Sequence, residues 1–200
     1  LQASTDTDGT LDAALARDAG QWLAPFVRVL GWAKASRQLW GNEQTTARWL
    51  KTLHHLAALV TSEGFVSCDA AADRCGQTVV PSDIDLFTCA VRLTEKDVET
   101  GLTTYAAALA NGGQRKPKST KDDRKQPKRN LSAQSDWATT AVLRNTLQVD
   151  ADVMSVDWGQ STQELRLSAL GRQVFGGGWK HHIIADGKVY MSVVWHTDLP

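Results

Sequence analysis

A basic stretch that is poor in apolar residues divides the chain into two parts. Residues 111–129 contain eight Lys or Arg residues and only two Asp, together with Gly, Pro and Gln. Such a segment cannot bury enough apolar surface to offset the cost of ordering it. We therefore predict a basic flexible linker at 111–134, between a first domain at 1–110 and a second at 135–200. Contact between the linker and nucleic acid stays open, because a run of like charges is as often simply solvated.

The overall composition is typical of a soluble globular protein. The 200 residues are 42% hydrophobic and 22% charged, with a formal net charge of zero. No apolar run is long enough to cross a bilayer, so we expect no association with a membrane. The first residue is Leu1 rather than methionine, which indicates an excised fragment or a processed product. The three cysteines form no CxxC pair, and we expect reduced thiols and no metal site.

Helical periodicity dominates the first part of the chain. Apolar residues recur at three- and four-residue steps, and Asn42, Thr45 and Thr46 can each cap the second of the helices that this pattern predicts. Pro25 is expected to kink or interrupt the first. Residues 61–80 show little periodicity and are interpreted as an insertion. The predicted helices cover residues 11–34, 45–60, 84–93 and, after a capping box at 94–97, 98–109.

Arg48 lies in the first turn of the helix at 45–60, where the helix dipole favours anions rather than cations. An arginine placed against that preference is often directed at a negatively charged ligand. The alternative is a solvated surface side chain.

The spacing of residues along this helix resembles the lid helices of the minichromosome maintenance (MCM) replicative helicases, an AAA+ family. The matching residues are Thr46, Arg48, Leu50, Leu53, Leu56 and Ala57. The resemblance implies that Arg48 is a sensor-2 arginine, which binds the γ-phosphate of ATP in a neighbouring subunit and supports catalysis there together with magnesium. Arginine suits that role because its guanidinium can bind phosphate oxygens bidentately. Lys51 departs from the family, which usually has an acidic residue at this position.

The second part is predicted to contain two helices and a hairpin. The helices are expected at 137–147 and from Ser161 or Thr162 to Val174, followed by three glycines. Two β-prone runs flank Asp186-Gly187, which is a strong hairpin signal. Helices followed by such a hairpin indicate a winged helix.

The end of the chain resembles the C-terminal winged helix of the MCM family, subunit three in particular. The expected fold class is therefore mainly α, with a helical AAA+ lid-like domain followed by a small α/β winged-helix domain. The resemblance implies part of a nuclear DNA replication helicase, whose partners are other helicase subunits, loading factors and DNA. Because the chain has no GxxxxGK[ST] loop, it should bind no ATP alone and act as an enzyme only within the complex.

Two other functions remain open. The chain could be a stand-alone winged-helix DNA-binding regulator, with phosphate contacts from Lys180, His181, His182 and Lys188. Alternatively, it is a non-enzymatic helical protein-interaction module, in which some of the eight tryptophans form an exposed contact surface. We expect Trp22, Trp49 and Trp137 to fill the core instead.

Overall fold

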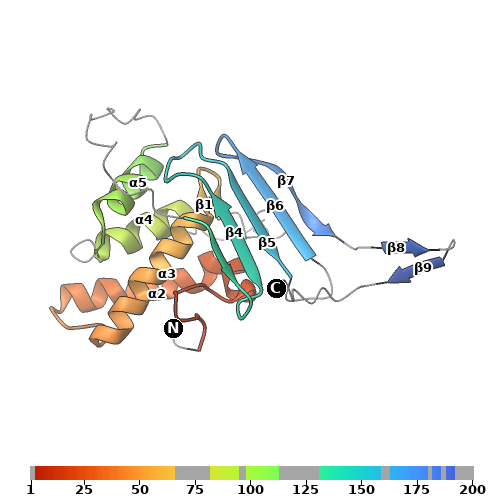
Figure 1. Cartoon of the computed structure of the whole chain (residues 1–200). Helices are drawn as coiled ribbons and strands as arrows, with labels where there is room; N and C mark the ends of the chain where they lie inside the picture. Colours follow the sequence, from red (N-terminus) through yellow and green to blue (C-terminus); the bar gives the residue numbers. More distant parts are fainter. Residues whose placement is uncertain are drawn as a thin grey trace, which may run out of the picture.

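The computed structural model describes residues 3–65, 82–94, 98–112, 131–158, 163–179, 182–185 and 188–191. Helices occupy the first part of the chain and an antiparallel sheet occupies the second, with the helices packed on one face of the sheet (Figure 1). The fold is thus mixed α/β, and the expectation of a mainly α protein with a lid and a winged helix is wrong.

The helices largely match the periodicity of the sequence. They are α1 (Ala13–Arg17), α2 (Ala19–Ala35), α3 (Glu43–Leu59), α4 (Asp83–Leu93) and α5 (Thr100–Ala110). The first predicted helix is divided at Asp18, whereas Pro25 lies inside α2, which continues past it. A short hairpin of β1 (Val60–Thr61) and β2 (Gly64–Phe65) follows α3, in the stretch that was expected to be irregular.

Local capping explains where two of the helices begin. The Asn42 side chain accepts a hydrogen bond from the Thr45 backbone N–H at 2.8 Å, which satisfies one of the free donors at the start of α3. At α4, Ser82 and Asp85 form a reciprocal capping box. The box expected at 94–97 is wrong, because Thr94 ends α4 and α5 starts after Glu99.

The sheet has five strands in the order β3-β4-β5-β6-β7, so each strand pairs with its neighbours in the chain. The strands are β3 (Ala133–Ser135), β4 (Thr140–Arg144), β5 (Val153–Asp157), β6 (Gln163–Ala169) and β7 (Arg172–Trp179). No helix occurs in the described residues after 131, which rules out the winged helix predicted there.

The helix predicted from Ser161 or Thr162 to Val174 is instead the β6–β7 hairpin. Leu165, Leu167 and Ala169 alternate with polar residues, and this period of two is the pattern of a half-buried strand. Leu170 and Gly171 connect the strands with φ of 52° and 75°. A two-residue hairpin turn of type I′, whose twist matches that of the flanking strands, requires positive φ at both central residues.

The helices and the sheet share one hydrophobic core. Leu53 and Leu56 of α3, Phe87 of α4 and Tyr105 of α5 are buried in the same cluster as Val142 of β4. The short strands β1 and β2 pack against α4. Independent folding of 1–110 and 135–200 stays a prediction, and the shared core argues against it. Most of the predicted linker lies outside the described residues, and its last residues begin β3.

Arg144, the last residue of β4, connects the sheet to the C-terminal end of α3 through hydrogen bonds. Its Nη1 donates to the carbonyl oxygens of Ala57 at 3.0 Å and Val60 at 2.6 Å, and its Nη2 donates to the Tyr105 hydroxyl at 2.8 Å. The last carbonyls of a helix have no partner within the helix and carry partial negative charge. A buried guanidinium therefore completes α3, and it lies over the Tyr105 ring at 4.8 Å from the centroid.

The hairpin predicted around Asp186-Gly187 is confirmed in its strands. β8 (His182–Ala185) pairs antiparallel with β9 (Lys188–Met191), with Ala185 opposite Lys188. The turn itself lies outside the described residues. The hairpin extends beyond the end of β7 and away from the helices (Figure 1).

Candidate functional site: the outer face of the sheet

The face of the sheet opposite the helices is apolar. Residues alternate across each strand, and the inward positions of β4 and β5 are buried, including Val142 and Val153. The outward positions between them carry aliphatic side chains and one methionine, and β6 and β7 add two leucines and a phenylalanine. We call the following residues the outer apolar face: Ala141, Leu143, Met154, Val156, Leu165, Leu167 and Phe175.

The register of the strands arranges these side chains in two rows. Leu143 is opposite Met154, Met154 is opposite Leu167, and Leu167 is opposite Phe175, so one row crosses four strands. The second row joins Ala141, Val156 and Leu165 and ends at Gly177. Directly opposite residues in a sheet have Cβ atoms about 4.5–5.5 Å apart, so each row is continuous.

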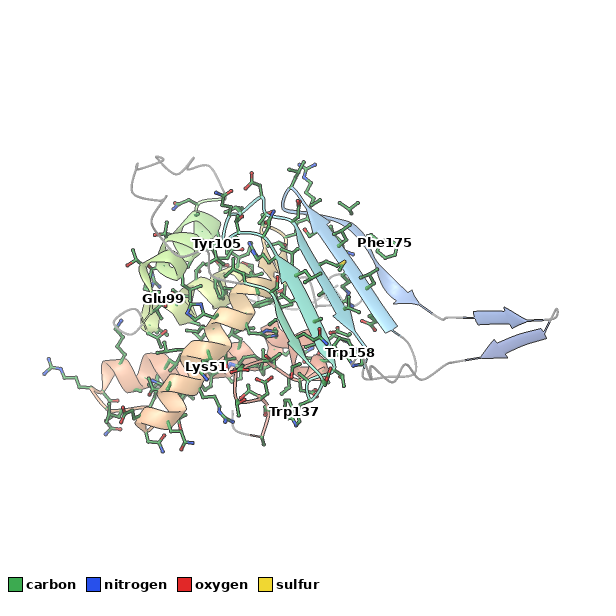
Figure 2. All side chains as sticks on the ribbon, viewed as in Figure 1. Lys51, Glu99, Tyr105, Trp137, Trp158 and Phe175 are labelled. Carbon is green, nitrogen blue, oxygen red and sulfur yellow. The ribbon has the colours of Figure 1, made fainter. Side chains whose placement is uncertain are left out.

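This face is open to solvent in the described structure. Leu143 is 50% exposed and Phe175 is 38% exposed, and the other five side chains are half-buried among their neighbours. Phe175 lies on β7, away from the helices (Figure 2). None of the seven residues carries a charge. Isolated exposed apolar residues are common, but a contiguous apolar patch usually marks a contact site.

The inner face of the same strands holds a buried network of charged and polar groups. Glu164 Oε2 lies 3.4 Å from Arg17 Nε and 3.0 Å from Arg166 Nη2, so it joins α1 to β6. Asp157 Oδ1 accepts a hydrogen bond from Thr140 Oγ1 at 2.6 Å. Burial raises the pKa of Asp157, while the bond from Thr140 and the charges of Arg17 and Arg166 act in the opposite direction.

This inner network is best explained as structural. Two carboxylates face two guanidiniums, so the network has no surplus charge with which to attract a ligand. The described residues contain no group of three or more side chains that could hold a metal ion. The network fastens α1 to the sheet and leaves the opposite face as the open surface.

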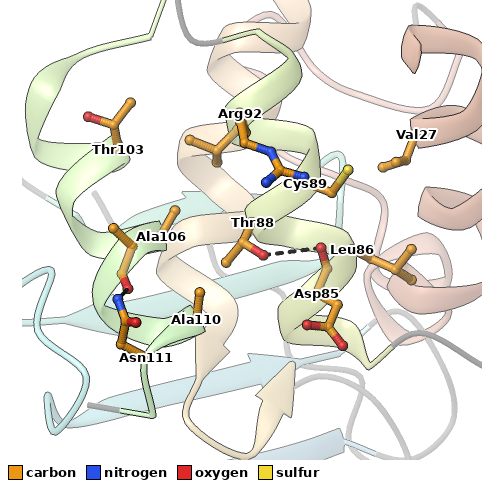
Figure 3. A pocket seen from close by; sticks show the side chains of 12 residues that line it. Val27, Asp85, Leu86, Thr88, Cys89, Arg92, Thr103, Ala106, Ala110 and Asn111 are labelled. Atoms are coloured by element: carbon orange, nitrogen blue, oxygen red, sulfur yellow. Dashed lines mark hydrogen bonds between the residues drawn. The ribbon is translucent and has the colours of Figure 1, made fainter. Parts of the chain in front are cut away.

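An open groove between α4, α5 and α2 is the second candidate (Figure 3). It has a volume of about 720 Å³ and is lined mostly by apolar side chains, with Val27 contributed by α2. Three of its polar side chains bond to the backbone of the preceding turn: Thr88 Oγ1 donates to Asp85 O at 3.1 Å, Thr103 Oγ1 to Thr100 O at 2.9 Å, and Asn111 Nδ2 to Ala107 O at 2.6 Å. No set of polar groups converges on a ligand position, so we assign no chemistry to the groove.

The residue predicted to act at an ATP site contacts the N-terminal segment of its own chain. Arg48 Nη1 lies 3.5 Å from Thr5 O, and Lys51 Nζ donates to Thr7 O at 2.7 Å. Arg48 is half-buried and belongs neither to the groove nor to the outer apolar face. Its role in binding ATP and magnesium in a helicase complex stays a prediction.

The four predicted DNA-binding residues lie at the hairpin and just before it. His182 begins β8 and Lys188 begins β9, at opposite ends of the ladder. Lys180 and His181 lie outside the described residues. The described residues after 131 contain no helix, so no recognition helix of a winged-helix domain lies beside His182 and Lys188.

The expectation for the tryptophans is correct in part. Trp49 is fully buried, with its ring centroid 4.4 Å from that of Phe26, and Trp22 packs against the core. Trp137, by contrast, is 53% exposed in the turn before β4. The outer apolar face was missed because its leucines were assigned to predicted helices, although the alternation of Leu165 and Leu167 with polar residues was visible in the sequence.

Comparison with known proteins gives no relative. No family model, curated protein or solved structure matches the chain. No helix in the described part is both long and apolar enough to cross a membrane.

Proposed function

We propose that this chain is a non-enzymatic protein-interaction module, and that its outer apolar face docks against the apolar face of another β-sheet. The observation that carries the proposal is the row Leu143–Met154–Leu167–Phe175, which crosses four strands without a charged residue.

A second sheet is the occupant that fits this surface best. Two sheets stack about 10 Å apart through interdigitating apolar side chains, and they need no charged groups at the contact. Full burial of a Leu or Phe side chain contributes roughly 1.5–3 kcal/mol relative to full exposure. Since Leu143 is 50% exposed, covering it would contribute about half of that amount, and Phe175 would contribute somewhat less.

Photo-crosslinking from within the face tests this function. The full chain carries benzoylphenylalanine in place of Phe175, and the control carries it in place of Trp32, which is 71% exposed on α2. Both positions replace an exposed aromatic residue. Irradiation of the native extract should give a defined protein crosslink from position 175 that is absent from position 32.

A second substitution separates docking from chance proximity. Leu143→Glu introduces a charge into the first row of the face and should abolish the crosslink from position 175. Leu39→Glu, at a site that is 93% exposed in the connection between α2 and α3, should leave it unchanged. Failure to crosslink from position 175, or a crosslink that survives Leu143→Glu, would refute the proposed function.

A further inference from the structure

The segment at residues 5–11, called the strap below, lies across one face of α3 (Figure 1). Arg48 Nη1 and Lys51 Nζ bond to carbonyl oxygens of the strap at 3.5 Å and 2.7 Å. Arg48, Lys51 and His55 recur at steps of three and four residues, so their side chains share one face of the helix. His55 therefore lies one turn further along the surface that the strap crosses.

The strap forms a turn that buries its last residues against the body of the protein. Asp6 Oδ1 accepts a hydrogen bond from the Thr10 backbone N–H at 2.8 Å. Thr10 is buried, and Leu11 belongs to the hydrophobic core cluster. At Gly9 the backbone lies so close to Lys51 that a Cβ would not fit. The strap thus covers α3 through direct contact.

His55 is buried beside the strap without a hydrogen-bond partner. Its side chain is 5% exposed, and neither ring nitrogen is bonded to any described residue. A protonated imidazole carries two N–H donors and a charge, and burying such a group without acceptors is costly. Burial lowers the pKa of His55 to about 4, although the charge of Asp6 on the strap acts in the opposite direction.

We propose that the strap is an acid-gated closure, which leaves α3 when His55 is protonated while the rest of the fold stays intact. Opening admits water to both ring nitrogens and so solvates the imidazolium that the closed strap excludes. It also withdraws Leu11 from the core cluster. This inference is independent of the outer apolar face and of the function proposed for it.

Few contacts hold the strap, so opening it costs less than unfolding the body. The bond from Lys51 is exposed to solvent, and Leu11 is the only large apolar side chain among residues 5–11. The body, by contrast, is joined by a core that α3, α4, α5 and β4 share. Segments with few buried apolar contacts open locally, at lower free energies than global unfolding.

The other charged groups near α3 do not supply the same response. Burial acts to raise the pKa of Asp6, but hydrogen bonds from Ser135 and from within the strap lower it below 3.8, so Asp6 stays ionised above that pH. Ser135, on β3, carries no charge. The remaining charged side chains on the strap, on this face of α3 and on β4 and β5 have partners of their own: Asp8, Arg48, Lys51, Arg144 and Asp157.

The size of the response follows from the pKa of His55 in the two states. In the open state His55 is solvated and returns to its ordinary pKa of 6.5, whereas the closed state holds it at about 4. Between these values, each unit of acidification multiplies the ratio of open to closed strap by up to about ten. From pH 6.5 to about 4.5 the ratio should rise on the order of 40-fold.

Thiol labelling of a buried strap position tests the closure in the full chain. Cys68, Cys75 and Cys89 are replaced by serine, and Thr10→Cys places a single thiol under the closed strap. The rate of reaction with dithiodipyridine, which labels thiols in acid, is divided at each pH by the rate for an unstructured peptide with the same cysteine. This ratio should show the predicted rise. Ala106→Cys, at a site in α5 that is 4% exposed, reports unfolding of the body and should label more slowly at every pH, by roughly tenfold or more.

Substitutions on α3 separate the group that responds to acid from the contacts that hold the strap. His55→Leu and His55→Gln both remove the titrating ring and should each flatten the rise, and the second keeps a polar side chain in case leucine packs poorly. Lys51→Met removes a bond to the strap, so it should raise labelling at every pH without changing the dependence on pH. A rise that survives both His55 substitutions, or equal labelling at positions 10 and 106, would overturn the inference.

Discussion

Acid should destabilise this protein through His55, which lies on α3 inside the core. The side chain is 5% exposed, and neither ring nitrogen has a hydrogen-bond partner among the described residues. Burial lowers the pKa of His55 to about 4 from its ordinary 6.5, although the charge of Asp6 acts in the opposite direction. The folded protein therefore holds this ring neutral over a range in which the unfolded chain protonates it.

The sign and size of the effect follow from proton linkage. Between the two pKa values the unfolded state binds more protons, so the free energy of unfolding rises with pH. The stabilisation is complete above pH 6.5 and is lost as the pH falls through the folded pKa of about 4. The difference between 6.5 and about 4 corresponds to roughly 3 kcal/mol, at about 1.4 kcal/mol for each pKa unit.

Urea unfolding at pH values between about 4.5 and 6.5, inside the window set by the two pKa values, measures the effect. His55→Leu removes the titrating group and should flatten the rise of stability with pH by up to about 1.4 kcal/mol per unit. Thr52→Val, at a buried position without a titrating group on the same helix, should keep the wild-type slope. Asp157, whose pKa is raised, contributes a slope of opposite sign, but it is present in every variant and cancels in the comparison. Equal slopes for wild type and His55→Leu would refute the reasoning.

Three further predictions concern the packing of helices on the sheet. Arg144→Met removes the guanidinium that donates to the Ala57 and Val60 carbonyls, and leaves Val60 O with the Tyr105 hydroxyl as its donor. It should cost on the order of 1–3 kcal/mol by chemical denaturation; a loss under about 0.5 kcal/mol would contradict its role. Gly171→Val should lower the midpoint temperature of unfolding, because Gly171 has a φ of +75° and an added Cβ would lie 2.6 Å from Ser62 Oγ. An unchanged midpoint would contradict the assigned β6–β7 turn. Trypsin should cut within 113–130, and the two fragments should stay associated in native gel filtration because they share a core; fragments that separate would support independent domains.

The helical part of this fold was largely predictable from the sequence. Long amphipathic segments with polar caps, such as the one that begins at Asn42, fix both the type and the approximate ends of a helix. The division between α1 and α2 at Asp18 was not predicted, because a proline is the stronger signal for a break and Pro25 is tolerated inside α2.

The sheet was mispredicted because short apolar runs fit both the 3.6-residue period of a helix and the two-residue period of a strand. Leu167, Leu170 and Val174 have the spacing of one helix face, but the alternation of Leu165, Leu167 and Ala169 with polar residues and the Leu170-Gly171 turn favour strands. At Trp137, the turn at 136–139 prevents the helix that its neighbours suggest.

The candidate site depends on strand register, which sequence alone does not give. Met154 and Leu167 are 13 residues apart in the sequence and become neighbours only when β5 pairs with β6. The role of Arg144 was equally hidden, because most of its acceptors are backbone carbonyls, including those of Ala57 and Val60, and the sequence does not show which carbonyls lack a partner.

The most direct test of the central claim is hydroxyl-radical footprinting of Met154, which lies within the outer apolar face. Its oxidation rate is measured in the native extract for the wild-type chain and for Leu143→Glu, and at high dilution for both purified proteins. If the face is a docking surface, Met154 is oxidised more slowly in the wild-type extract than in the variant extract, and the rates converge on dilution. Equal rates in the two extracts would show that nothing covers the face, and would contradict the account.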